Sequence, residues 1–524
     1  MDFIWILIAF VCGVMARSIA LPPLIGYLIA GFLLNYLGYE SKSVLQVLSD
    51  MGITLMLFTI GLKLRLKDIF KTEVWATTIS HMSLWILISG GLFLALSVTA
   101  LSYFSNLDIK VIALIAFALS FSSTVCIVKI LEESGELKTR HGKIAVAILV
   151  MQDIIAVVFM ALATGATPSL WAFGLPALIL LVPVIGALLN RVGHGELLPL
   201  MGLFLAFGAY ELFYLLNIKG DLGALIIGVL LNGHSKSAEM YKSLISFKDI
   251  FLIGFFLSIG FSALPTFEML VIALMLMVLI PIKAIAFYGL LVLMKLRART
   301  SFLSSLLLSN YSEFGLIVVA LCVQSGWLEK EWLVILALAV SLSFVITSLI
   351  YRNAHSLYAR YTQSLNKFES TKRLQDDVFE LPKSAEVLVI GMGRVGKGTY
   401  QSLCQMVNNR VWGLDADEDR YRRLKAQGYR IFYGDGEDAE LWKSLDLSHT
   451  KLVLIALPFI RDIQNIQEQL RNVNYQGKVA AIARYEDQIE KLTECGIDKI
   501  FNFYNEAGVG FAKESLTLID HQSK

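Results

Sequence analysis

Residues 147–158 read Ala-Ile-Leu-Val-Met-Gln-Asp-Ile-Ile-Ala-Val-Val, which places an acidic side chain in the middle of an apolar run. An ionised carboxylate is costly inside a bilayer, so an acidic residue in a membrane span is a candidate functional group. This run lies in one of thirteen apolar segments that we expect to cross a membrane. The predicted segments are 3–16, 19–37, 46–62, 74–101, 109–131, 144–163, 171–189, 197–216, 221–233, 249–262, 267–294, 301–323 and 332–351.

The composition of the whole chain also indicates a membrane protein. Of its 524 residues, 56% are hydrophobic and 17% are charged, and the mean hydropathy is +0.65. A soluble protein carries roughly 25% charged residues, so much of this surface is expected to face lipid. The 45 basic and 43 acidic residues nearly cancel, which leaves no overall field for binding nucleic acid. We therefore expect membrane lipid, and no nucleic acid, as a partner.

The sequence changes character near Tyr351, after which charged residues are dense and no run is long enough to span a bilayer. The predicted division is a transmembrane domain over 1–351, a linker over 352–383 and a cytosolic domain over 384–524. Lys and Arg in alternate loops number fifteen in one set and four in the other. Basic loops tend to stay in the cytoplasm, so we expect the N-terminus outside and the C-terminal domain inside.

The C-terminal domain alternates short apolar strands with helical stretches, which predicts a parallel, doubly wound, Rossmann-like sheet. Its first strand leads into a G-x-G-x-x-G motif that opens a helix, and this context favours binding of a phosphate. The candidate nucleotide-binding residues are Gly391, Gly393, Arg394, Val395, Gly396, Asp415, Gly434 and Asp435. Asp415 follows the second strand, where an acidic side chain is expected to hold ribose hydroxyls. AMP and NAD(H) both fit this pattern. No second substrate domain follows, so we expect a regulatory sensor and not an enzyme.

Two predicted membrane segments contain polar interruptions. The fifth includes Ser120-Phe-Ser-Ser-Thr124, and the twelfth includes Ser309-Asn-Tyr-Ser-Glu313. Polar breaks at comparable places in two halves predict inverted repeats with discontinuous helices that meet at the bilayer midplane. The candidate ion-binding residues are Ser123, Thr124, Gln152, Asp153, Lys283, Ser312 and Glu313.

Asp153 is expected to bind a cation when ionised and a proton when neutral. The alternative is a carboxylate that is permanently paired for structure. Lys283, in the eleventh segment, is either the ion-pair partner of Asp153 or a competitor of the cation.

These motifs together resemble those of the Kef-type monovalent cation:proton antiporters, which are glutathione-regulated potassium efflux systems with a C-terminal TrkA-N (RCK) domain. Gln152-Asp153, Ser312-Glu313-Phe314 and the Gly-rich loop with Asp415 carry the resemblance. It implies a homodimer in the bacterial inner membrane that exchanges K⁺ or Na⁺ for H⁺ and binds AMP or NAD(H). In glutathione-gated members the loop after the ninth segment is acidic, whereas residues 235–248 hold three Lys and one Glu. The sequence therefore leaves open whether a glutathione-type effector regulates the protein.

Two other functions compete with the antiporter. A nucleotide-gated potassium channel would need a carbonyl filter of the T-V-G-Y-G kind, and this sequence has none. A membrane-tethered dehydrogenase would need a substrate domain. The leading hypothesis is an antiporter in which one carboxylate exchanges one cation for one proton, regulated from the cytosolic domain through the linker.

Overall fold

The computed structural model describes the chain apart from residues 1–2, 19–22, 40–42, 64–69, 99–102, 105–106, 164–168, 170–174, 176–177, 194, 217, 219, 233, 235, 371–373, 375–381, 383–384, 407–409, 484–485 and 521–524. The chain forms two compact units. The first is Met1–Ile127 with Ile144–Ser370, and the second is Val128–Lys143 with Thr371–Lys524.

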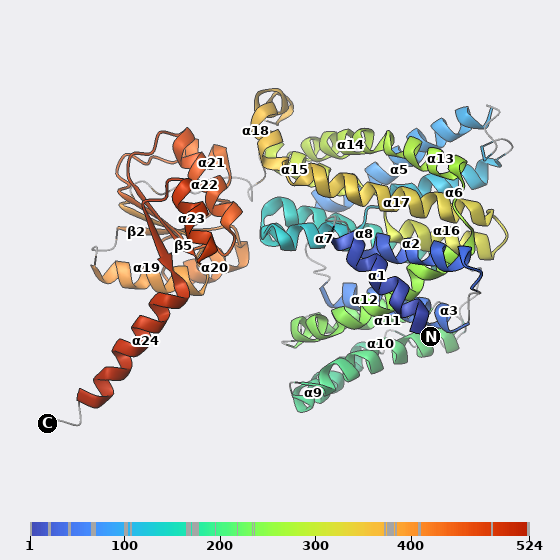
Figure 1. Ribbon diagram of the computed structural model, residues 1–524, viewed down its shortest axis with the longest axis horizontal. Helices are drawn as coiled ribbons and strands as arrows, with labels where there is room; N and C mark the ends of the chain where they lie inside the picture. Colours follow the sequence, from blue (N-terminus) through green and yellow to red (C-terminus); the bar gives the residue numbers. More distant parts are fainter. Residues whose placement is uncertain are drawn as a thin grey trace. The chain divides into compact units, whose positions relative to one another are not determined.

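Every element of regular secondary structure in the described part of the first unit is a helix (Figure 1). Its helices are α1 (Phe3–Ser18), α2 (Pro23–Tyr36), α3 (Ser43–Lys63), α5 (Thr72–Ser97), α6 (Ile109–Ser120), α9 (Leu178–Val192), α10 (Leu197–Leu215), α11 (Gly220–Leu231), α12 (Ser237–Ser262), α13 (Phe267–Met277), α14 (Leu279–Leu293), α15 (Ala298–Leu308), α16 (Glu313–Gln324), α17 (Lys330–Tyr351) and α18 (Ala354–Leu365), followed by the 3₁₀ turn η3 (Asn366–Phe368). Two more helices, α7 (Thr124–Glu133) and α8 (Arg140–Ala163), belong partly to each unit.

Each of the thirteen predicted segments contains one helix or two half-helices. Within the described residues, seven helical stretches are long and apolar enough to cross a membrane, and five shorter helices are also apolar. The fifth and twelfth segments break where their polar runs predicted, into α6 with α7 and α15 with α16.

The eleventh segment, 267–294, was expected to be one helix but is two, α13 and α14. Pro281 explains the break. A proline ring in a helix collides with the carbonyl four residues earlier, here that of Met277, the last residue of α13. In the first turn of a helix, the backbone N–H groups have no carbonyl partner within the helix, so a proline there loses no hydrogen bond. The chain therefore ends α13 and starts α14 just before the proline.

Two glycine pairs bring helix backbones of the first unit into contact. A Cβ on Gly31 of α2 would lie 2.7 Å from the carbonyl oxygen of Leu257 in α12, and one on Gly260 would lie 2.5 Å from the Cα of Gly31. Gly61 of α3 and Gly228 of α11 approach in the same way, with a Cβ on Gly228 only 3.0 Å from the Cα of Gly61. Side chains at these positions would force the helices apart.

The second unit contains a six-stranded parallel sheet in the order β3-β2-β1-β4-β5-β6. Its strands are β1 (Val387–Ile390), β2 (Val411–Asp415), β3 (Ile431–Tyr433), β4 (Leu452–Ile455), β5 (Lys478–Ala483) and β6 (Lys499–Asn502). This is the strand order of a Rossmann fold. The predicted fold class, a helical membrane domain followed by a Rossmann-like domain, is confirmed.

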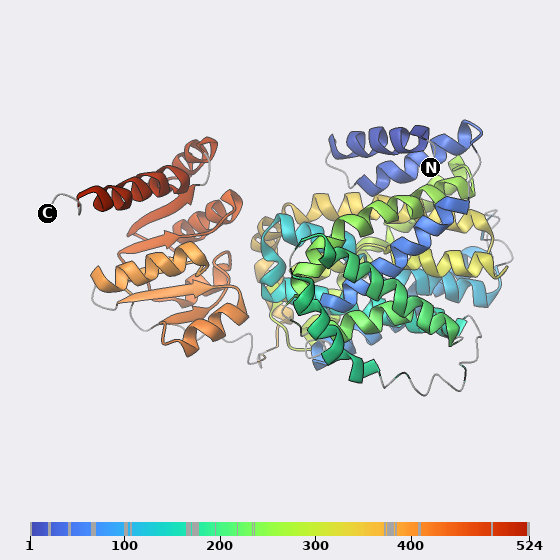
Figure 2. The same ribbon diagram turned by 90° about the horizontal axis from the view of Figure 1, so that it is seen from below.

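Helices cover both faces of this sheet. One face packs against α19 (Arg394–Met406) and α20 (Glu418–Ala426). The other packs against α21 (Ala439–Ser444), α22 (Ile460–Asn472) and α23 (Asp487–Glu494). The last helix, α24 (Phe503–Asp520), runs away from the sheet, as Figures 1 and 2 show. It leaves Tyr504, Phe511 and Leu516 exposed.

The division into units differs from the predicted domain boundaries in two respects. The first unit extends through α18 and η3 to Ser370, and most of the remaining linker lies outside the described residues. Residues 128–143, predicted to belong to the transmembrane domain, group instead with the sheet. They comprise the end of α7, the 3₁₀ turn η1 (Glu136–Lys138) and the start of α8. We call residues 134–139 the α7–α8 loop.

Candidate ion site and nucleotide pocket

The two interrupted helices are tied together at their breaks. Between α6 and α7 the chain is extended, and Phe121 has φ −70° and ψ 152°. The Ser122 hydroxyl donates a hydrogen bond to the carbonyl of Leu308 at 2.6 Å. The backbone N–H of Ser123 donates to Oδ1 of Asn310 at 2.8 Å. The polar residues that interrupt each helix thus provide bonding partners for the other.

Gln152 and Asp153 of α8 face this crossing. The Thr124 hydroxyl donates to Oδ2 of Asp153 at 2.9 Å, and the N–H of Ser122 donates to Oε1 of Gln152 at 2.9 Å. Gln152 and Asp153 are 0% and 1% exposed. Oδ1 of Asp153 has no hydrogen-bond partner within the described residues. Buried carboxylate oxygens are nearly always bonded, which makes this atom a candidate contact for a ligand.

Lys283 of α14 is completely buried, and its ammonium is held by backbone carbonyls. Nζ donates to the carbonyl oxygens of Leu119 at 3.1 Å, Phe121 at 2.7 Å and Asn310 at 2.7 Å. These carbonyls lie at the C-terminal ends of α6 and α15, where helices leave acceptors unsatisfied and carry partial negative charge. In the described structure Lys283 therefore neutralises two helix ends and forms no ion pair with Asp153.

The remaining predicted residues mark the N-terminal ends of the second half-helices. The N–H of Cys126 donates to the Ser123 hydroxyl at 3.1 Å in α7, and the N–H of Phe314 donates to the Ser312 hydroxyl at 3.0 Å in α16. Glu313, in the first turn of α16, is 2% exposed and interacts electrostatically with Asp153 and with Lys248 of α12. The crossing thus places carboxylates beside helix N-termini and an ammonium beside helix C-termini, each the favourable arrangement.

All seven predicted ion-site residues come together at this crossing, and Asn310 was missed. Asn310 is fully buried, its Oδ1 and its carbonyl are both engaged, and its Nδ2 has no partner among the described residues. Its position inside the polar run of the twelfth segment was the signal that pointed to it.

In the second unit, the Gly-rich loop takes the conformation that its glycines predict. Gly391 has φ +84°, in the left-handed region that favours glycine. A Cβ on Gly396 would collide with the carbonyl oxygen of Gly391, whereas one on Gly393 would meet nothing within 4 Å. The loop is therefore tight on the sheet side and open at Gly393, next to the N-terminus of α19, which starts at Arg394.

Asp415 at the end of β2 closes this loop. Its Oδ2 accepts bonds from the N–H of Met392 and from the Arg420 guanidinium, both at 2.7 Å, and its Oδ1 accepts the N–H of Asp417 at 2.7 Å. A carboxylate offers about four lone-pair sites, so the three bonds described here leave about one of them. Arg420 was not predicted, because a basic residue on an exposed helix gives no sequence signal.

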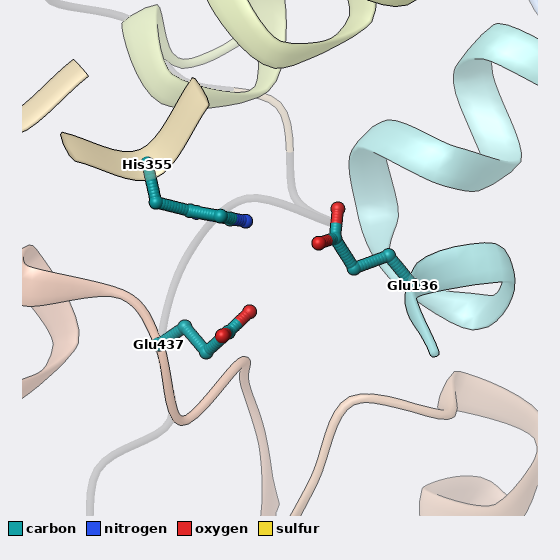
Figure 3. A group of neighbouring side chains, drawn as sticks. All are labelled: Glu136, His355 and Glu437. Atoms are coloured by element: carbon teal, nitrogen blue, oxygen red, sulfur yellow. The ribbon is translucent and has the colours of Figure 1, made fainter. Parts of the chain in front are cut away.

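A cavity of about 220 Å³ lies beside Asp415 at the carboxyl ends of the strands. Four predicted residues line it, namely Gly391, Asp415, Gly434 and Asp435, while Gly393, Arg394, Val395 and Gly396 are not among its walls. The α7–α8 loop supplies a further wall, which sequence reasoning missed. Figure 3 shows two acidic side chains of this cavity, Glu136 from η1 and Glu437 from the loop after β3.

Comparison with known proteins gives the family. The profile described as sodium/hydrogen exchanger, transmembrane, matches residues 6–352, and that of the TrkA-N domain matches residues 387–503. The chain belongs to the sodium/hydrogen exchanger family. The exchanger is 27% identical over 510 residues to the glutathione-regulated potassium-efflux system protein KefC of Escherichia fergusonii, covering 92% of this chain and 79% of the relative. KefC of Shigella flexneri serotype 5b is 28% identical with the same coverage. The exchanger is therefore a Kef-type cation:proton antiporter with a C-terminal TrkA-N domain.

Two solved structures resemble separate parts of this exchanger. The sodium proton antiporter MjNhaP1 of Methanocaldococcus jannaschii has 15% identity and a TM-score of 0.44, covering 70% of this chain and 96% of its own. The NAD(P)-binding domain of an exopolyphosphatase-related protein from Archaeoglobus fulgidus has 21% identity and a TM-score of 0.24, covering 25% of this chain and 98% of its own.

Proposed function

We propose that this antiporter exchanges K⁺, or alternatively Na⁺, for H⁺ at Asp153. The main support for this proposal is the buried Asp153 carboxylate, whose Oδ1 has no hydrogen-bond partner in the described residues. Lys283, the nearby ammonium group, is bound instead by backbone carbonyls. Because that lysine is engaged elsewhere, Asp153 is left to attract a cation. Ionised Asp153 binds the cation beside Thr124 and Gln152, and protonation of the same carboxylate releases it. One carboxylate used in this way exchanges one cation for one proton.

The KefC relatives are named as potassium-efflux proteins, which favours K⁺ over Na⁺ as the cargo. The deciding experiment measures pH changes inside proteoliposomes after addition of K⁺, Na⁺, Rb⁺ or Li⁺. Exchange with K⁺ and Rb⁺ but not with Na⁺ supports a potassium antiporter. Exchange with Na⁺ and Li⁺ alone would assign the alternative cargo, and ion currents without coupled proton movement would indicate a channel.

We also propose that the protein lies in the bacterial inner membrane, with its N-terminus outside and the TrkA-N domain in the cytoplasm. The excess of Lys and Arg in one set of loops supports this orientation. The α7–α8 loop then lies on the cytoplasmic side, together with the domain with which it forms one unit.

The nucleotide pocket regulates exchange in this proposal. Its wall includes Lys138 and Thr139 of the α7–α8 loop, and Lys138 forms an ion pair with Asp417 at 2.7 Å. The chain on either side of the loop continues into α7, which starts at Thr124, and α8, which carries Asp153. AMP or NAD(H) bound against the loop therefore acts on the two helices of the ion site without passing through the linker. The ligand shifts the equilibrium only by as much as its affinity for the two loop positions differs.

Replacing Gly393 by Asp should remove nucleotide binding. The new carboxylate would lie next to the N-terminus of α19, where a phosphate is expected, and like charges repel. We expect AMP and NAD(H) to bind at least about tenfold more weakly, equivalent to about 1.4 kcal/mol. Isothermal titration calorimetry of the full chain measures this, with Gly398→Asp, also open but farther along α19, as the matched control. Unchanged affinity in Gly393→Asp would place the ligand elsewhere.

We further propose a homodimer in which α24 packs on the second copy. The helix leaves Val509, Phe511 and Leu516 exposed, at 48%, 77% and 59%. Apolar side chains exposed together on one helix indicate an interaction surface.

Phe511→Asp should weaken that association by about 2 kcal/mol, or roughly 30-fold, as expected for an aromatic interface anchor. Light scattering of the detergent-solubilised chain over a dilution series measures the change. Glu506→Gln, an exposed substitution on the same helix, is the control. Equal dissociation of both variants would exclude α24 from the interface.

A further inference from the structure

The cavity beside Asp415 has a second feature that nucleotide binding does not explain. Besides Asp415 and Asp417, four acidic side chains line it, namely Glu136 from η1, Asp435 and Glu437 from the loop after β3, and Asp462 from α22. A phosphate would be repelled by such a group, so this end of the cavity does not suit the anionic part of a nucleotide.

Asp462 lies where α22 meets the α7–α8 loop. Gly135 of the loop has φ +73°, and a Cβ there would lie 2.8 Å from the ring of Phe459 and 3.4 Å from a carboxylate oxygen of Asp462. The loop backbone therefore packs directly on the first turn of α22. Burial, together with the charges of Glu437, Asp435 and Glu136, raises the pKa of Asp462 to about 8.

Within the described part of the second unit, few positive charges act on this carboxyl group. Arg461, its neighbour on α22, partly offsets the acidic groups. His141 is held by Glu136 at 2.7 Å, Lys138 is paired with Asp417, and Lys143 is paired with Glu418 at 3.3 Å. Asn465 donates to Glu437 at 2.7 Å and carries no charge. The protonation of Asp462 therefore changes the negative charge under the loop by one unit.

We propose that the acidic cluster Glu136, Asp435, Glu437 and Asp462 is a proton-operated latch, which holds the α7–α8 loop against α22 when Asp462 is neutral and releases it when Asp462 ionises. Its effect on transport rests on the proposed function, because the loop joins the helices that carry Thr124 and Asp153. An alkaline cytoplasm would then free an exchanger that brings protons in. The latch itself is a property of loop packing and holds whatever ion is carried.

The direction of the pH dependence follows from the two states of the carboxyl group. With the loop packed, Asp462 keeps its proton up to about pH 8, whereas a solvated aspartate loses its proton near pH 4. The packed state thus binds the extra proton, so it is favoured at low pH and loses stability as pH rises from about 4 to about 8. The equilibrium between packed and released loop should shift about tenfold per pH unit in this window and level off above it.

Hydrogen exchange measured by mass spectrometry on the purified full chain, without nucleotide, tests the latch. After correction for the intrinsic pH dependence of exchange, protection of residues 134–139 should fall about tenfold between pH 7 and pH 9, with most of the fall below pH 8, and change little above pH 9. Asp462→Asn should remove this fall and keep the loop protected. Asp446→Asn, in the loop between α21 and β4, should behave as wild type. Constant protection from pH 7 to pH 9, or an unchanged fall in Asp462→Asn, would overturn the proposal.

A second variant guards against a general loss of structure. Gly135→Ala keeps every charge but pushes a methyl group into Phe459 at a positive φ, so protection of the loop should be low at both pH 7 and pH 8. If Gly135→Ala instead keeps the wild-type protection and pH slope, the loop does not pack as the latch requires. These measurements need no transported ion. A chain that fails to exchange K⁺ but shows the fall refutes the proposed function alone, and one that exchanges K⁺ without the fall refutes the latch alone.

Discussion

Asp153→Asn should abolish cation-driven proton movement in proteoliposomes, with a fall of at least about 100-fold. An amide keeps the size of the side chain and can still pair with Thr124, but it carries no charge for a cation and releases no proton. In enzymes, a positioned proton-transfer group contributes about 100-fold to 10,000-fold, which sets the expected scale here. The expected result is a fluorescence trace indistinguishable from empty vesicles after a K⁺ pulse, at every pH tested.

The control for this prediction is Asp108→Asn, the same substitution at the exposed start of α6. It should exchange at the wild-type rate, and both variants should elute as wild type in size-exclusion chromatography. Exchange at more than about a tenth of the wild-type rate in Asp153→Asn would show that another group carries the proton. Glu313, the second buried carboxylate at the crossing, would then be the candidate.

Lys283→Met should cost both transport and stability. The thioether fills similar space but donates nothing, so the carbonyls of Leu119, Phe121 and Asn310 would lose a charged donor at once. Leaving a buried hydrogen-bonding group unsatisfied typically costs about 1–3 kcal/mol, and three carbonyls are affected here. We expect a clear fall in the melting temperature of the detergent-solubilised chain and exchange below detection.

Lys242→Met, on an exposed lysine of α12, is the matched control and should leave the melting temperature within about 1 °C of wild type. The informative contrast lies between stability and transport. If Lys283→Met melts as wild type yet cannot exchange, Lys283 acts on the ions and not on the helix ends. If it melts early but exchanges normally at low temperature, its role is structural alone.

The helical part of the fold was predictable because lipid imposes long apolar runs, and these are visible in one sequence. The breaks after Ser120 and Leu308 were also visible, since each carries a cluster of side chains that can bond to unwound backbone. The break before Leu279 was missed although Pro281 was in view. Proline also occurs inside membrane helices, so its presence alone does not show whether a helix bends or stops.

The residues of the candidate site could be predicted from the sequence, but the contacts between them could not. Asp153 and Lys283 were both found because charges are rare in membrane spans, yet the partner of each depends on the fold. Lys283 donates hydrogen bonds to three backbone carbonyls. Because every residue has a backbone carbonyl, no sequence pattern predicts which ones a buried lysine will bind. Asp415 was found through its spacing from the Gly-rich loop. The α7–α8 loop was missed because its contacts with the sheet domain are formed by residues far apart in the sequence. Lys138 and Asp417, for example, are about 280 residues apart.

The glycine contacts Gly31 with Gly260 and Gly61 with Gly228 have a mechanical consequence. Backbones that touch leave no side chains between them to rearrange, so α2, α3, α11 and α12 resist sliding past one another. An exchanger must open its site to one side of the membrane and then to the other, which requires a stationary body against which something moves. These four helices have the stiffness of such a frame, and we expect bulky residues at any of the four glycines to stop the cycle without touching an ion.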